Sequence, residues 1–187
     1  MKKIIMVFIL IVMITSAWAK GGGAGGTFFG YQMSSYPFLE ESVVILNNSF
    51  GLTYYGGYGY GVRSDGAISG GFGMAIMDPV NESGITGGFG GVINGVQLIT
   101  MPVHLNLMSY TGFGGIYTGN NSVNRDTCFF VILEEIDLEL GVPLFRWFMP
   151  VVYIGYQVAG NILPGDLFSS FLSYTPVMGV RLAWGSF

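Results

Sequence analysis

An alternation between bulky and small residues in Leu52–Ile93 constrains the fold more than any other feature of this sequence. Tyrosine, phenylalanine, methionine and isoleucine occupy one parity, and glycine, alanine and serine occupy the other. Side chains alternate across a β-strand with a period of two, so the pattern predicts strands with one bulky apolar face and one nearly bare face. We expect these strands near Leu52–Val62, Ala67–Met77 and Gly84–Ile93, the first two joined through Ser64-Asp65-Gly66.

The sequence outside Leu52–Ile93 also predicts mainly β-strands. Asn94-Gly95 is typical of a type I′ turn, so a new strand is expected from Val96, with an edge, bulge or break at Pro102. Ser34–Asn48 breaks the alternation and is expected to form a loop or a short helical insertion. Other strands are expected near 27–33, 111–117, 129–142, 147–159 and 176–185. The chain is therefore predicted to be all-β, an antiparallel up-and-down β-barrel of about 8–10 strands.

The N-terminus has the organisation of a signal peptide. Lys2 and Lys3 precede an apolar run at Ile4–Ile14, and Ala17-Trp18-Ala19 supplies a cleavage site. An uncleaved anchor is the alternative. We expect residues 1–19 to be the signal peptide and residues 20–187 to form a single barrel domain of an exported protein.

Charge and composition exclude several classes of function. Charged residues make up 10% of the chain, against about 25% in an ordinary soluble domain. No basic patch is present, which argues against nucleic acid as a partner. Cys128 is the only cysteine and His104 the only histidine, so neither an internal disulfide nor a metal site is expected. No cofactor is predicted.

The choice between a membrane barrel and a soluble barrel depends on which face of the predicted strands contacts water. A solvated surface is normally rich in charged residues, whereas the small face of these strands holds mostly glycine, alanine and serine. Such small residues suit the interior of a narrow closed barrel. The bulky face is then expected to meet lipid. The alternative is a soluble exported or periplasmic barrel or sandwich that binds an apolar ligand or self-assembles. The aromatic residues predicted to face lipid are Tyr58, Tyr60, Phe72, Phe89 and Trp184.

One acidic ladder stands out in the second half of the chain. Glu135, Asp137 and Glu139 share one face of a predicted strand, with Glu134 beside them, and Arg181 lies on the polar face of the closing strand. If both polar faces point into one lumen, Arg181 is expected to pair with these carboxylates. A solvated face, a cation-binding ladder and a catalytic carboxylate pair are the alternatives. No nucleophile and base are arranged for catalysis, so no enzymatic activity is predicted.

The signal segment, the aromatic-rich alternating strands and the terminal Phe187 resemble small bacterial outer-membrane β-barrels. The glycine-rich start and the closing GVRLAWGSF also resemble glycine-rich proteins exported by anaerobic and thermophilic bacteria. The first resemblance implies an outer-membrane location, contact with membrane lipid, the barrel-assembly machinery as a partner, and a structural or ligand-binding role. The assembly signal places apolar residues on the parity of the terminal aromatic, which here requires a bulge at Gly185-Ser186.

Overall fold

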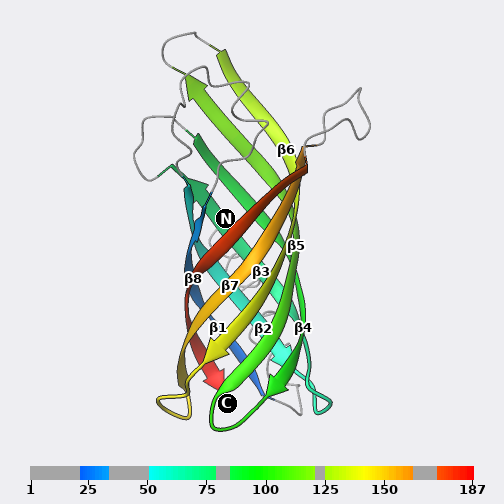
Figure 1. The fold of residues 1–187 in the computed structure, drawn as a ribbon, viewed down its shortest axis with the longest axis vertical. Helices are drawn as coiled ribbons and strands as arrows, with labels where there is room; N and C mark the ends of the chain where they lie inside the picture. The colour runs from blue at the N-terminus through cyan, green and yellow to red at the C-terminus, as the bar shows by residue number, and fades with distance from the viewer. Residues whose placement is uncertain (1–21, 34–50, 79–84, 121–124, 162–171) are drawn as a thin grey trace, which may run out of the picture.

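The described residues form a closed barrel of eight antiparallel strands (Figure 1). The computed structural model describes residues 22–33, 51–78, 85–120, 125–161 and 172–187. The strands are β1 (Gly23–Gln32), β2 (Leu52–Val62), β3 (Ala67–Met77), β4 (Ile85–Ile99), β5 (His104–Asn120), β6 (Arg125–Gly141), β7 (Phe148–Asn161) and β8 (Leu172–Ser186). Each strand pairs with its neighbours in sequence, and β1 pairs with β8. The predicted up-and-down barrel is confirmed.

Two sequence predictions lie outside the described residues. These are the signal peptide at residues 1–19 and the insertion at Ser34–Asn48. Within the described part of the chain, no helix is long and apolar enough to cross a membrane.

The barrel has two different ends. The connections at 63–66, 100–103 and 142–147 lie at one end, together with Gly23 and its strand partner Ser186. We call this the short-turn end; it is at the bottom of Figure 1. The strand ends at Gln32, Met77, Asn120 and Asn161 lie at the opposite end.

The predicted turn at Asn94-Gly95 is wrong, because both residues lie inside β4. Asn94 pairs with Ser69 of β3 and with Ser109 of β5, so backbone pairing on both sides keeps the strand extended. The turn is made instead by residues 100–103, and Pro102 is the break between β4 and β5.

The two halves of the barrel place their bulky residues on opposite sides. In β2, β3 and the first half of β4 most bulky residues point inward and small residues point outward. The second half of β4 and the strands β5–β8 carry many large apolar side chains on the outer wall. The prediction that Tyr58, Phe72 and Phe89 face lipid is therefore wrong, since all three are buried in the barrel interior. Tyr60 is half-buried and packs against the same core. Trp184 is 42% exposed on the outer wall.

Strand register explains this orientation. Directly paired residues of antiparallel strands project to the same face of the sheet. Glu135 pairs with Tyr110, Tyr110 with Ile93, Ile93 with Gly70, and Gly70 with Tyr60. An inward acidic ladder on β6 therefore brings the tyrosine face of β2 inward as well. The bulk of these aromatic rings fills the part of the interior that the glycines of the other strands leave open.

The inward glycines make room for these rings. A Cβ atom on Gly30 would overlap the rings of Tyr54 and Tyr153, and one on Gly179 would overlap the Tyr153 hydroxyl and the Phe29 carbonyl oxygen. Most outward glycines have more room, although a Cβ atom on Gly23 would lie 2.9 Å from the Tyr60 carbonyl oxygen. A Cβ atom on Gly59 would meet nothing within 4 Å. Close packing inside the barrel thus explains the inward glycines. It does not explain outward glycines such as Gly59.

Candidate functional site

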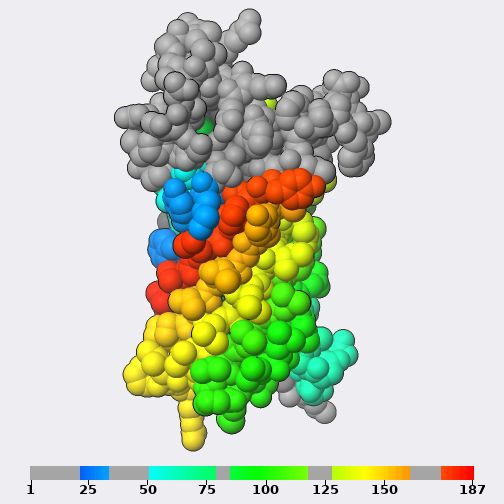
Figure 2. Space-filling model, viewed as in Figure 1, coloured from blue at the N-terminus to red at the C-terminus, as the bar shows by residue number. Residues whose placement is uncertain are grey.

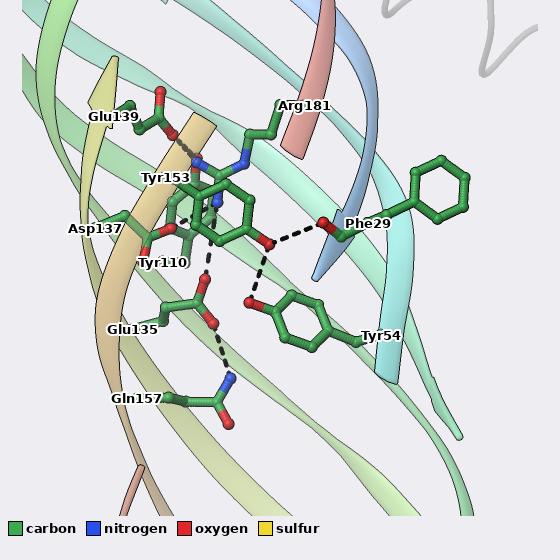
Figure 3. A network of polar contacts seen from close by, with 9 residues as sticks. All are labelled: Phe29, Tyr54, Tyr110, Glu135, Asp137, Glu139, Tyr153, Gln157 and Arg181. Atoms are coloured by element: carbon green, nitrogen blue, oxygen red, sulfur yellow. Dashed lines mark hydrogen bonds and ion pairs between the residues drawn. The ribbon is translucent and has the colours of Figure 1, made fainter. Parts of the chain in front are cut away.

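The most unusual site in the barrel is a buried guanidinium surrounded by three carboxylates (Figure 3). Arg181 of β8 is 2% exposed. Its Nη2 atom lies 2.6 Å from Asp137 Oδ2 and 3.7 Å from Glu135 Oε1, and its Nη1 atom forms an ion pair with Glu139. The four residues predicted to form a lumen cluster are thus brought together inside the barrel. Carboxylates outnumber the guanidinium three to one.

Aromatic rings from four other strands complete the surroundings of Arg181. Its Cζ atom lies 3.9 Å from the centroid of the Tyr153 ring and 4.5 Å from that of Tyr110. Phe28 and Tyr58 lie further away, at 5.8 and 6.0 Å. A guanidinium over aromatic faces gains electrostatic stabilisation, and the gain is larger where water is excluded. The rings that the sequence predicted to face lipid therefore include one that contacts the central cation.

Neutral hydrogen-bond donors hold two of the carboxylates. Gln157 Nε2 donates to Glu135 Oε2 at 2.8 Å, and Tyr110 Oη donates to Glu139 Oε1 at 2.8 Å. The sequence reasoning did not select these donors, although Gln157 shares the polar parity of β7 and Tyr110 lies on the parity of the inward His104. The inward positions of Gln157 and Tyr110 in the alternating pattern of their strands could have identified both donors.

A pair of tyrosines packs beside the ion cluster. Tyr153 Oη donates to Tyr54 Oη at 3.0 Å and lies 3.4 Å from the Phe29 carbonyl oxygen. This contact links β7, β2 and β1 across the interior (Figure 3). Polar atoms of the lumen therefore connect strands that are distant around the barrel.

Replacing Tyr110 by phenylalanine removes the hydrogen bond to Glu139 while keeping the ring against Arg181. Because a hydrogen bond to a charged group contributes about 1.5–3 kcal/mol, we expect the free energy of unfolding to fall by that amount. Urea unfolding of the folded barrel in detergent measures this change. Tyr55→Phe is the matched control, since Tyr55 is 43% exposed on the outer wall and should leave the unfolding midpoint in place.

This arrangement closes the interior. Buried side chains from all eight described strands form one continuous core, and the ion cluster lies within it. An eight-stranded barrel is just wide enough for side chains to fill. Among the described residues, no group of three or more His, Cys, Asp or Glu side chains is placed to hold a metal ion. The predictions that the chain has no cofactor and no enzymatic activity stay predictions.

The outer wall carries large apolar side chains between two groups of aromatic residues. At the short-turn end, neighbouring rings of Phe145, Trp147, Phe148 and Trp184 lie 5.5–5.9 Å apart. Figure 2 shows the wall of β5–β8 as an unbroken surface of side chains. The exposed tyrosines of the described strands all lie toward the opposite end, and they are Tyr31, Tyr55, Tyr117, Tyr156 and Tyr174. Apolar side chains exposed between the two groups include Leu107, Ile136, Leu138, Val152, Ile154 and Val180.

The terminal Phe187 does not continue the outer face of β8. Its ring packs against the interior core and lies 6.0 Å from the His104 ring, edge to face. Gly185 and Ser186 remain paired with Ala24 and Gly23, so the bulge expected at these two residues is not formed. Phe187 has the inward parity of Arg181 and Ala183.

Comparison with known proteins supports the fold. The barrel is similar to the crystal structure of Neisserial surface protein A, with a TM-score of 0.58 and 9% sequence identity, over 89% of this chain and 95% of that chain. No protein-family model and no curated protein sequence matches the chain. At this identity the similarity shows the fold alone. It gives no support to the expected relation with glycine-rich exported proteins.

Proposed function

We propose that this chain is a small outer-membrane β-barrel with a structural role and no enzymatic activity. The observation that carries the proposal is the outer wall, where exposed apolar side chains lie between two groups of aromatic residues. Such a band flanked by aromatic girdles is the mark of a barrel that lies in lipid. In water the same wall would be an aggregation hazard.

Two further observations support this location. The N-terminal sequence has the pattern of a secretory signal peptide, and the fold is shared with a protein named as a surface protein. Membrane lipid and the barrel-assembly machinery are then the proposed partners.

The filled lumen favours a structural role over transport. Arg181, its three carboxylates and the surrounding aromatic rings occupy the cross-section from several strands at once. An apolar ligand in the lumen would have to displace these side chains. We therefore place any contact with other molecules on the outer wall or at the barrel ends.

Fractionation tests the proposed location. After export in a Gram-negative host, we expect the mature chain to stay in the membrane pellet after sodium carbonate extraction and to dissolve in detergent. We also expect it to run faster on a gel when unheated than when boiled, because a closed barrel resists unfolding by detergent. Release by carbonate into the soluble fraction would show instead the soluble exported barrel.

A further inference from the structure

The turn between β6 and β7 exposes large apolar side chains beyond the ends of its strands. Residues 142–147 read VPLFRW, and Leu144, Phe145 and Trp147 are 57–58% exposed. This turn is the yellow segment at the lower left of Figures 1 and 2. A group of exposed apolar side chains marks contact with a membrane or with another molecule.

Backbone hydrogen bonds fix the shape of this turn. The Phe148 N–H donates to the Phe145 carbonyl oxygen at 3.3 Å. Arg146 and Trp147 are therefore the two central residues of a β-turn. The Gly185 N–H of β8 donates to the Trp147 carbonyl oxygen at 3.0 Å, which ties the turn to the neighbouring strand. The Arg146 side chain is thus carried by a backbone held at both edges.

Arg146 differs from the other arginines whose side chains the structure places. Arg63 pairs with Asp65, and Arg181 pairs with three buried carboxylates. Arg146 is exposed, and no ion pair between described residues includes it. A guanidinium has five N–H donors in a planar fork. Those of Arg146 are open to a ligand.

Aromatic rings adjoin this cation on the outside of the barrel. Phe145 and Trp147 stand on either side of Arg146 in the sequence, and their rings stack at 5.5 Å with 10° between the planes. The row of rings continues through Phe148 to Trp184 of β8. Aromatic side chains of membrane barrels lie at the level of the lipid headgroups. A guanidinium beside them can form two parallel hydrogen bonds with a lipid phosphate.

The charges around the turn favour an anionic phospholipid over a zwitterionic one. Residues 142–147 contain one arginine and no acidic residue. Asp65, in the turn between β2 and β3, is already paired with Arg63 and lies on the opposite side of the eight-stranded barrel. A phosphate can therefore pair with Arg146, whereas the ammonium group of a zwitterionic headgroup would meet no carboxylate side chain of this turn.

We propose that the β6–β7 turn binds one anionic phospholipid. The Arg146 guanidinium holds its phosphate, and its acyl chains lie over the rings of Trp147 and Trp184. Short turns of outer-membrane barrels lie on the periplasmic side, so the bound lipid belongs to the periplasmic leaflet. This inference rests on the proposed membrane location and names one lipid class among the proposed partners.

Fluorescence quenching by brominated lipids tests the lipid class. The chain from Lys20 onward has Trp147 and Trp184 as its tryptophans, so Trp184→Phe keeps a ring at that position and leaves one reporter beside Arg146. The barrel is placed in mixed vesicles of phosphatidylglycerol and phosphatidylethanolamine, with one lipid brominated at a time. We expect phosphatidylglycerol to be enriched about fivefold next to Trp147, relative to its bulk fraction.

Two charge variants form a matched pair in this Trp184→Phe background. Arg146→Gln removes the open guanidinium and should make the two lipids quench Trp147 equally. Arg63→Gln removes one positive charge at the same end of the barrel and should leave the preference unchanged. Equal quenching before the Arg146 change, or a preference that persists in Arg146→Gln, would overturn the proposal. Loss of the preference with inorganic phosphate, but not with chloride at the same ionic strength, would show a site for free phosphate and would also overturn it.

Folding is followed separately, which keeps this inference distinct from the proposed function. Each variant should keep heat-modifiable gel mobility and resist carbonate extraction. A folded, carbonate-resistant barrel without a lipid preference would overturn the bound phospholipid and leave the proposed function intact. A Trp147 that neither lipid quenches would have the same meaning, because it would place the turn in water. Release of the chain by carbonate would overturn both.

Discussion

Replacing Arg181 by alanine is expected to lower the free energy of unfolding by about 3–5 kcal/mol, because it leaves three buried carboxylates without their counter-charge. Arg181 is 2% exposed, and Glu135, Asp137 and Glu139 are each buried in the interior. The measurement is urea unfolding of the refolded barrel in detergent, followed by gel mobility and tryptophan fluorescence. If the variant fails to refold, Arg181→Lys keeps a positive charge and should refold with a smaller loss.

A matched arginine provides the control for this experiment. Arg63 pairs with Asp65 at 3.0 Å in the turn between β2 and β3, where the two side chains are 73% and 55% exposed. Exposed ion pairs contribute little, so Arg63→Ala should change the free energy of unfolding by less than about 1 kcal/mol. Adding Asp137→Asn to Arg181→Ala should recover part of the lost stability. Equal unfolding midpoints for Arg181→Ala and Arg63→Ala would show that the buried cluster has no structural role.

The second large effect is expected at an inward glycine. Gly179→Ala places a methyl group where the Tyr153 hydroxyl and the Phe29 carbonyl oxygen already lie. Overpacking of a filled interior costs about 1–3 kcal/mol, so the urea midpoint should fall accordingly. The shift should also disturb the hydrogen bond between Tyr153 and Tyr54.

An outward glycine gives the opposite expectation. A Cβ atom on Gly59 meets no heavy atom within 4 Å, and alanine restricts the unfolded chain more than glycine does. Gly59→Ala should therefore leave the unfolding midpoint unchanged or raise it slightly. If Gly59→Ala destabilised the barrel as much as Gly179→Ala, the inward and outward assignment of the two glycines would be contradicted.

The sequence predicted the barrel and the lumen cluster because both depend on local patterns. Alternation with a period of two located most strands, and the shared polar parity of Glu135, Asp137 and Glu139 identified the ladder that meets Arg181. Residues two apart on a strand always share a face, so no knowledge of tertiary structure was required.

The orientation of β2–β4 could not be predicted in the same way. Alternation shows that Tyr58 and Gly59 face opposite sides, but it does not show which side is the interior. That choice is made by register across four strand pairs, from Glu135 through to Tyr60. The turn wrongly predicted at Asn94-Gly95 divided β4 and hid this connection. The rule that small residues fill a narrow lumen also failed, because glycines on β1 and β8 leave space that aromatic rings occupy.

The central claim is that the glycine face of β2 points out of the barrel into lipid. A spin label attached to Gly59→Cys, in the Cys128→Ser background and in lipid vesicles, tests it directly. We expect a mobile label that collides with oxygen dissolved in the bilayer and is protected from a water-soluble nickel complex. A label immobilised and shielded from both reagents would place Gly59 inside the barrel, and a label relaxed mainly by the nickel complex would place this wall in water; either result would contradict the account.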